Sequence, residues 1–195
     1  MAESRRGRPG RTERGASAVE FALVGPLFFL LLAAIIDLSV GLFTLDGASS
    51  AAAEAARVGS IARNSPDADA QILDTFTARS SLGVGLTTHR VVVYQASGSD
   101  AGPPAECLAG RQRDGCNVYE GATLTHPMSL CSGAGGSTGG WCPALRADGH
   151  LLGVWFSVEY DGLTGVLPLH WTRHAYAVAE IEPAPVRAPG SGGSP

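Results

Sequence analysis

The four cysteines are the residues whose chemistry is easiest to predict. All of them follow a long apolar run and lie in a stretch rich in Gly, Pro and Ser, at Cys107, Cys116, Cys131 and Cys142. An even number of cysteines beyond a membrane segment favours disulfides. Zinc binding is the alternative, but no C-x-x-C pair occurs and the cysteines are spaced more widely than usual zinc ligands. Of the three possible connectivities we choose the sequential one, Cys107 with Cys116 and Cys131 with Cys142, on proximity alone.

The histidines and short motifs do not predict a catalytic centre. Of five histidines, only His170 and His174 have a spacing that would suit a metal on one helix. They stand instead in a turn-and-strand region with Pro168 and Trp171. The nucleophile elbow, the P-loop and the HExxH pattern are all absent from the sequence. We therefore predict no catalytic residues, no metal and no cofactor, and a protein that is not an enzyme.

A long apolar run near the N-terminus predicts a membrane helix over residues 16–45. The run has no charged residue from Phe21 to Ile36, and a helix of this length is sufficient to cross the hydrocarbon layer. Pro26 should bend or loosen it near its inner end. We expect Asp37 to lie toward the outer boundary, where its carboxylate reaches water or pairs with a neighbouring subunit. A removable secretory signal is the alternative, although the run is about twice as long as a typical signal-peptide core.

The charges on either side of the run predict its orientation. Five arginines precede it, at Arg5, Arg6, Arg8, Arg11 and Arg14, whereas Asp46 and Glu54 follow it before the next basic residue. The basic side stays in the cytoplasm, so the C-terminal part should be extracytoplasmic. The formal net charge of −4 gives no general basic field, and we expect no nucleic acid among the partners.

The junction before the apolar run has the pattern of a processing site. Gly15 and Ala16 are followed by Glu20 and Phe21, which resembles the substrates of prepilin peptidases, with cleavage between Gly15 and Ala16. Gly15 would let an extended backbone approach a protease closely. A charged Glu20 is costly in a membrane unless it forms an ion pair. The new amine of Ala16 on an adjacent subunit would be its partner, and this pair would fix the axial position of one stem relative to the next. The alternative is that Glu20 is only an interfacial carboxylate near the helix N-terminus.

The first fifty-odd residues are similar to the TadE-like family of pseudopilins, components of the tight-adherence (Flp-type) pilus machinery. The resemblance is carried by RGASAVEFALV at 14–24, PL at 26–27, IID at 35–37 and AAAEAAR at 51–57, and more faintly by CNVY at 116–119 and LTG at 163–165. The family often has Glu at the position of Asp37. The resemblance implies processing by a prepilin peptidase, association with other pilins or pseudopilins, and a minor or assembly role in pilus formation.

The exported part predicts a small α+β head. A helix over 46–63 continues the stem with a face of small residues, which fits either neighbouring stems or this protein's own sheet. Ser65 and Pro66 begin a second helix that should end near Ser80. Its inward residues should be Ile72, Leu73 and Phe76. Three antiparallel strands are expected over 88–96, 151–160 and about 174–182.

The organisation that follows is a membrane-anchored chain with one head. We predict a basic leader at 1–15, a membrane helix at 16–45, a head at 46–182 with a disulfide-containing loop at 98–149, and a disordered tail at 183–195. The leading functional hypothesis is a pseudopilin or pilus-assembly subunit in the cell membrane. The alternative is a single-pass surface protein whose head binds a ligand and which has no connection with pili.

Overall fold

The computed structural model describes residues 11–80, 85–124, 131, 139–165 and 170–183. The larger elements are α1 (Arg11–Ala62), α2 (Ala68–Ser80), β1 (Leu86–Ala96), β2 (Cys116–Glu120), β3 (Leu151–Asp161) and β4 (His170–Glu180). Short helical pieces are α3 (Ala105–Leu108), η1 (Gly121–Leu124) and η2 (Pro143–Leu145). Most of the predicted leader, the predicted tail after Pro183 and part of the predicted disulfide loop lie outside the described residues.

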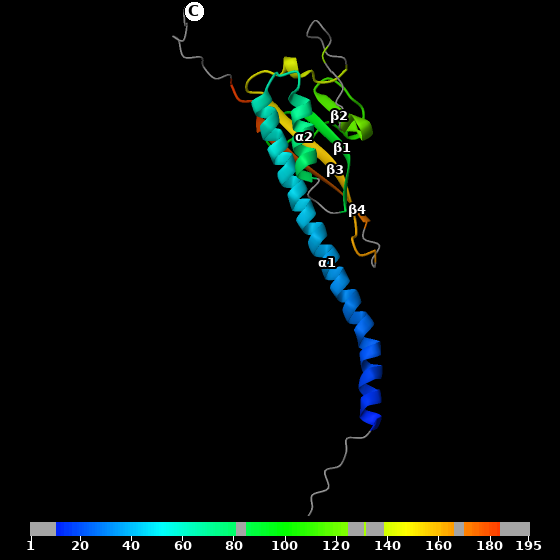
Figure 1. The fold of residues 1–195 in the computed structure, drawn as a ribbon. Helices are drawn as coiled ribbons and strands as arrows, with labels where there is room; N and C mark the ends of the chain where they lie inside the picture. The colour runs from blue at the N-terminus through cyan, green and yellow to red at the C-terminus, as the bar shows by residue number, and fades with distance from the viewer. Residues whose placement is uncertain (1–10, 81–84, 125–130, 132–138, 166–169, 184–195) are drawn as a thin grey trace, which may run out of the picture.

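One helix of 52 residues, α1, forms the stem and enters the head (Figure 1). It continues through Pro26, which membrane helices tolerate. Its C-terminal half packs against α2, β3 and β4, while its N-terminal half projects away from the head (Figure 1). The predicted membrane helix and the predicted stem helix are therefore parts of a single element.

The head contains a four-stranded antiparallel sheet with the order β2-β1-β3-β4. The three predicted strands correspond to β1, β3 and β4. The strand β2 is an addition, because it lies inside the segment that we predicted as a loop. It has only five residues, too few to show a clear alternating pattern, and it is held at the sheet edge by pairing with β1.

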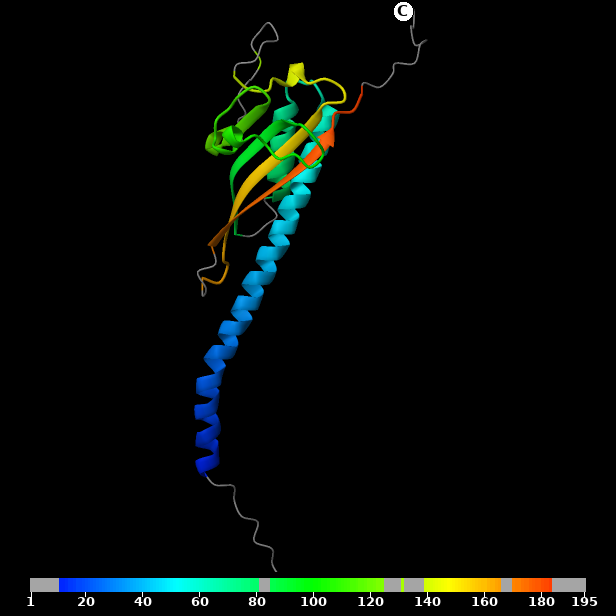
Figure 2. The same cartoon turned by 180° about the vertical axis from the view of Figure 1, so that it is seen from behind.

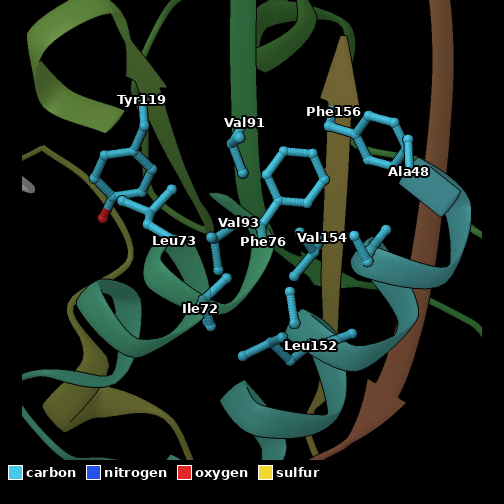
Figure 3. Close-up of a cluster of buried hydrophobic side chains, with 14 of the residues drawn as sticks. Ala48, Ile72, Leu73, Phe76, Val91, Val93, Tyr119, Leu152, Val154 and Phe156 are labelled. Atoms are coloured by element: carbon cyan, nitrogen blue, oxygen red, sulfur yellow. The ribbon is translucent and has the colours of Figure 1, made fainter. Parts of the chain in front are cut away.

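The main core lies between the sheet and the layer formed by α1 and α2 (Figure 3). The predicted inward residues Ile72, Leu73 and Phe76 are all fully buried, so this prediction is confirmed. The rings of Phe76 and Phe156 lie 4.9 Å apart between their centroids. Val154, Phe156, Val158 and Tyr160 are every second residue of β3, so they lie on one face of the sheet, and all four are buried.

The small-residue face of α1 packs inside this protein's own head. Five alanines on it are buried: Ala48, Ala51, Ala52, Ala55 and Ala56. A Cβ atom added at Gly59 would lie 2.6 Å from the Ile72 side chain, so the absence of a side chain lets α1 and α2 approach closely. Of the two interpretations of this face, the structure supports packing against the protein's own sheet, and these alanines are not available to neighbouring stems.

The first part of the segment inserted between β1 and β3, including Ala101 and Cys107, covers the other face of the sheet (Figure 2). The disulfide between Cys107 and Cys116 joins α3 to β2, and Cys131 is joined to Cys142. This is the sequential pairing that we chose from the sequence. The hydroxyl of Tyr94 donates a hydrogen bond of 2.7 Å to the carbonyl of Ala101, which further fixes the insertion on the sheet.

Candidate functional site: the stem and its junction with the head

The N-terminal half of the stem exposes large apolar side chains in all directions. Successive residues from Leu27 to Leu32 are all exposed, and because they are about 100° apart around a helix they cover its whole circumference. By length and composition α1 is able to cross a membrane, and very little of its most apolar stretch is buried in the protein. An unpaired apolar surface of this kind is expected to be covered by lipid or by other helices.

The exposed part of the stem matches the thickness of a bilayer. From Gly15 to Ile36 the helix is about 33 Å long at 1.5 Å per residue, and the hydrocarbon layer is about 30 Å thick. The helix continues as apolar on one side through Leu42 and Phe43, which are exposed. On the opposite face of the helix, contacts with the head begin at Asp37.

The residues of the predicted processing site lie at the exposed N-terminal end of α1. Gly15, Glu20 and Phe21 are exposed, and a Cβ atom at Gly15 would meet nothing within 4 Å. The backbone of Gly15 and Ala16 is helical, whereas the proposed role of Gly15 in protease binding needs an extended backbone. The first turns of α1 would therefore have to unwind for cleavage, and a glycine lowers the cost of unwinding by about 1 kcal/mol relative to alanine. Within the part of the chain that the structure describes, Glu20 has no ion-pair partner.

Asp37 is buried and is bound by the loop that connects β3 and β4. Its Oδ1 atom accepts hydrogen bonds from the backbone N–H groups of Leu163, at 3.0 Å, and Thr164, at 3.1 Å. Its Oδ2 atom accepts one of 2.6 Å from the Thr164 hydroxyl. The residue is 0% exposed. The expectation that Asp37 reaches water or a neighbouring subunit is therefore wrong: the head itself supplies the donors that a carboxylate needs at this depth.

Two aromatic residues complete the junction. The Tyr160 hydroxyl donates a hydrogen bond of 3.1 Å to the Asp37 backbone carbonyl. Burial, followed by the charge of Asp37, raises the pKa of the Tyr160 hydroxyl, so it remains protonated and able to donate. Trp171 lies against the helix at Gly41, where an added Cβ atom would come within 2.6 Å of its ring. We call Asp37, Gly41, Tyr160, Thr164 and Trp171 the stem junction.

At the far end of the head, a second buried polar group fixes the insertion to α2. Asp69 accepts hydrogen bonds of 2.6 Å from Asn117 and from the Tyr119 hydroxyl, and its other oxygen pairs with Arg146 at 2.5 Å. Arg146 also lies over the Trp141 ring. Burial and the nearby charge of Asp69 raise the pKa of Tyr119. Sequence reasoning missed this group, because its members are far apart in the chain and no local pattern connects them.

Comparison with known proteins gives one match. Residues 15–57 match the family described as TadE-like protein, in agreement with the resemblance found in the sequence. The matched segment contains the exposed stem, Asp37 and most of the buried alanine face, and it ends before α2. The similarity is confined to this segment of α1, which is long and apolar enough to cross a membrane. Neither the curated proteins nor the solved structures give a match to the chain.

Proposed function

We propose that this chain is a pseudopilin-type assembly subunit of a tight-adherence (Flp-type) pilus system. The observation that carries the proposal is the family match over residues 15–57. The first half of the matched helix is apolar and exposed, and it is long enough to cross the hydrocarbon layer of a bilayer. In this proposal the leader is cytoplasmic, the stem crosses the cell membrane and the head is extracytoplasmic. The protein acts by assembly rather than by catalytic turnover.

Removal of the leader between Gly15 and Ala16 would be the first step. A prepilin peptidase would act on the unwound first turns of α1 and leave the rest of the stem in the membrane. The new amine of Ala16 would carry a positive charge, and Glu20 of an adjacent subunit would be its partner. The exposed position of Glu20 supports this role, since its carboxylate is accessible to a neighbouring chain.

Lateral packing would use the N-terminal half of the stem. The buried alanines of the other half already contact the head, so the surface left for other pilins or pseudopilins is the apolar circumference between Gly15 and Ile36. Helix association in a membrane depends on close packing and on a few polar contacts, and a matched Glu20 would supply such a contact.

The test uses two glycines of the same helix. At both Gly15 and Gly47 an added Cβ atom would meet nothing within 4 Å, so a leucine at either position fits the folded protein. Cells with an intact prepilin peptidase should convert the wild type and Gly47→Leu to a chain that begins at Ala16. Gly15→Leu should remain as the full-length precursor in the membrane.

N-terminal sequencing of the membrane-extracted protein decides the outcome. A wild-type N-terminus at Met1 would overturn the processing step and favour a surface protein unrelated to pili. If processing is observed, Glu20→Gln tests the register role: it should be cleaved normally but fail to co-purify with the other pilus subunits. Glu54→Gln, a change of the same kind on the upper stem, should co-purify as the wild type does.

A further inference from the structure

Two histidines and two carboxylates converge at the end of the sheet nearest the stem junction. They come from β1, β3 and β4 and are His89, Glu159, Asp161 and His170. The Nε2 atom of His170 lies 2.5 Å from Oε1 of Glu159, and its Nδ1 atom lies 2.8 Å from Oδ1 of Asp161. His89 contacts the second carboxylate oxygen of Glu159. We call these four residues the His-carboxylate cluster.

The strand geometry brings these side chains together. Glu159 and Asp161 are two residues apart on β3 and therefore lie on the same face. Asp161 is directly opposite His170 in the register of β3 and β4, so the imidazole reaches both carboxylates. The cluster is thus fixed by backbone pairing on three strands rather than by a single loop.

A β-bulge adds the fourth member. The pairing of β1 with β3 passes from Thr88 opposite Val158 to Arg90 opposite Ser157, which leaves His89 without a cross-strand partner. The extra residue places the side chains of His89 and Arg90 along the same outward hollow, which Trp155, Ser157 and His174 also line. Bulges commonly redirect a side chain toward a functional site, and here the bulge directs an imidazole toward Glu159.

The donor set has the chemistry of a transition-metal site. Imidazole nitrogen and carboxylate oxygen are ligands that Zn²⁺ accepts, whereas Mg²⁺ prefers oxygen ligands alone. The ligand atoms of Glu159, Asp161 and His170 all lie within 4.8 Å of one another. Ligands of one tetrahedral Zn²⁺ lie about 3.3 Å apart, given bonds of about 2.0 Å. Opposite ring nitrogens of His170 face the two carboxylates. An ion bound to one of these nitrogens would therefore require the other carboxylate to turn toward it.

From this geometry we propose that the His-carboxylate cluster binds one divalent transition-metal ion, with Zn²⁺ as the representative. The ion would offset the repulsion between the neighbouring carboxylates and replace the direct contacts between imidazole and carboxylate. It would also connect β3 and β4 close to the loop that binds Asp37, while His89 of β1 holds Glu159 from the other side. This site differs from the pair His170 and His174 considered in the sequence, and it departs from our prediction of no metal.

His174 supplies the matched control for the test. It lies four residues from His170 on β4, is exposed, and stacks on Trp155 with ring centroids 5.1 Å apart. The full-length protein, purified in detergent with its disulfides intact, is titrated with ZnCl₂ and separately with MgCl₂ by calorimetry. Wild type and His174→Gln should bind one Zn²⁺ per chain and should not bind Mg²⁺. His170→Gln should bind Zn²⁺ at least about tenfold more weakly, because it loses a ligand. His89→Gln, which removes only a contact to Glu159, should weaken binding less.

A second measurement keeps the result independent of folding. Co²⁺ added to the wild type should give visible absorption bands of a nitrogen- and oxygen-ligated ion, which EDTA removes and His170→Gln lacks. Circular dichroism checks that each variant retains its fold. Because His170 is exposed at the sheet edge, His170→Gln is not expected to unfold the protein. Absence of Zn²⁺ binding by the wild type, or equal binding by His170→Gln and His174→Gln, would overturn the proposal.

Discussion

The two halves of α1 have the same backbone conformation and opposite surroundings. From Gly15 to Ile36 the helix carries large apolar side chains that are exposed on all sides. From Asp37 to Ala62 its apolar face consists mainly of alanine and glycine and is buried against α2 and the sheet. The small groups allow α2 and the sheet to approach, whereas the large groups are left exposed, as expected for a surface that lipid or other helices would cover.

The comparison also explains the position of Asp37. A carboxylate between an apolar segment and a packed segment is costly in either one unless donors surround it. The loop between β3 and β4 supplies these donors, so the change of environment coincides with a specific polar contact. The head therefore begins to contact α1 at Asp37.

A charge placed in each half should give the largest contrast. Leu27→Arg puts a guanidinium on the exposed N-terminal half and should weaken membrane insertion by about 3 kcal/mol. Ser50→Arg puts the same group on the exposed side of the other half and should leave insertion unchanged. Fractionation of cells into membrane and soluble parts after alkaline extraction measures both. Equal extraction of the two variants would contradict the difference between the halves.

A larger side chain should destabilise the C-terminal half of α1 and leave the N-terminal half unaffected. Ala52→Leu inserts three carbon atoms into the packed face, where Ala52 is fully buried, and should lower the free energy of unfolding of the head by about 1–3 kcal/mol. Ala22→Leu makes the same change at an exposed position of the N-terminal half and should have no such effect. Thermal unfolding of the detergent-solubilised protein, followed by near-UV circular dichroism, gives the comparison. If both variants have the melting temperature of the wild type, Ala52 is not tightly packed in the folded protein.

The junction between the halves should be moderately sensitive. Asp37→Asn keeps the oxygen that accepts from the two loop N–H groups, but it replaces the acceptor of the Thr164 hydroxyl with an NH₂ donor and removes the charge. It should cost about 1 kcal/mol. Asp46→Asn, on the exposed side of the helix, serves as the control and should be neutral. The melting temperature of the detergent-solubilised protein reports the change. A neutral result for Asp37→Asn would show that the loop does not depend on the carboxylate.

The smallest effect is expected at the surface of the upper half. Glu54 and Arg57 are three residues apart, with 4.0 Å between the charged atoms; Arg57 is largely exposed and Glu54 is half-buried. Glu54→Ala should change stability by no more than a few tenths of a kcal/mol, as for other exposed helical pairs. Urea unfolding of the head measures this, and a loss larger than 1 kcal/mol would mean that Glu54 has another partner.

Local patterns in the sequence were sufficient for most of the fold. The apolar run predicted the membrane helix, the Ser65-Pro66 start predicted α2, and the alternation in β3 predicted its buried face. These patterns depend on neighbouring residues in the chain, so they can be read without knowledge of the tertiary structure. The family resemblance depended on the same local features of the stem.

The features that were missed depend on distant residues. The strand β2 forms because β1 offers an edge and the Cys107–Cys116 disulfide holds the insertion near it. Asp37 is buried because a loop more than a hundred residues later binds it, and His89 reaches Glu159 through a bulge. None of these pairings leaves a periodic pattern in the sequence, so only the folded chain reveals them.

The stem junction has a mechanical consequence. Because α1 runs without interruption from the apolar segment into the core and Asp37 binds the nearest loop, we expect a rotation of the stem near Asp37 to turn the head with it. In the proposed topology, a tilt that neighbouring helices impose on the stem would then be passed on to the head. Packing inside the membrane would in that case set which face of the head points outward.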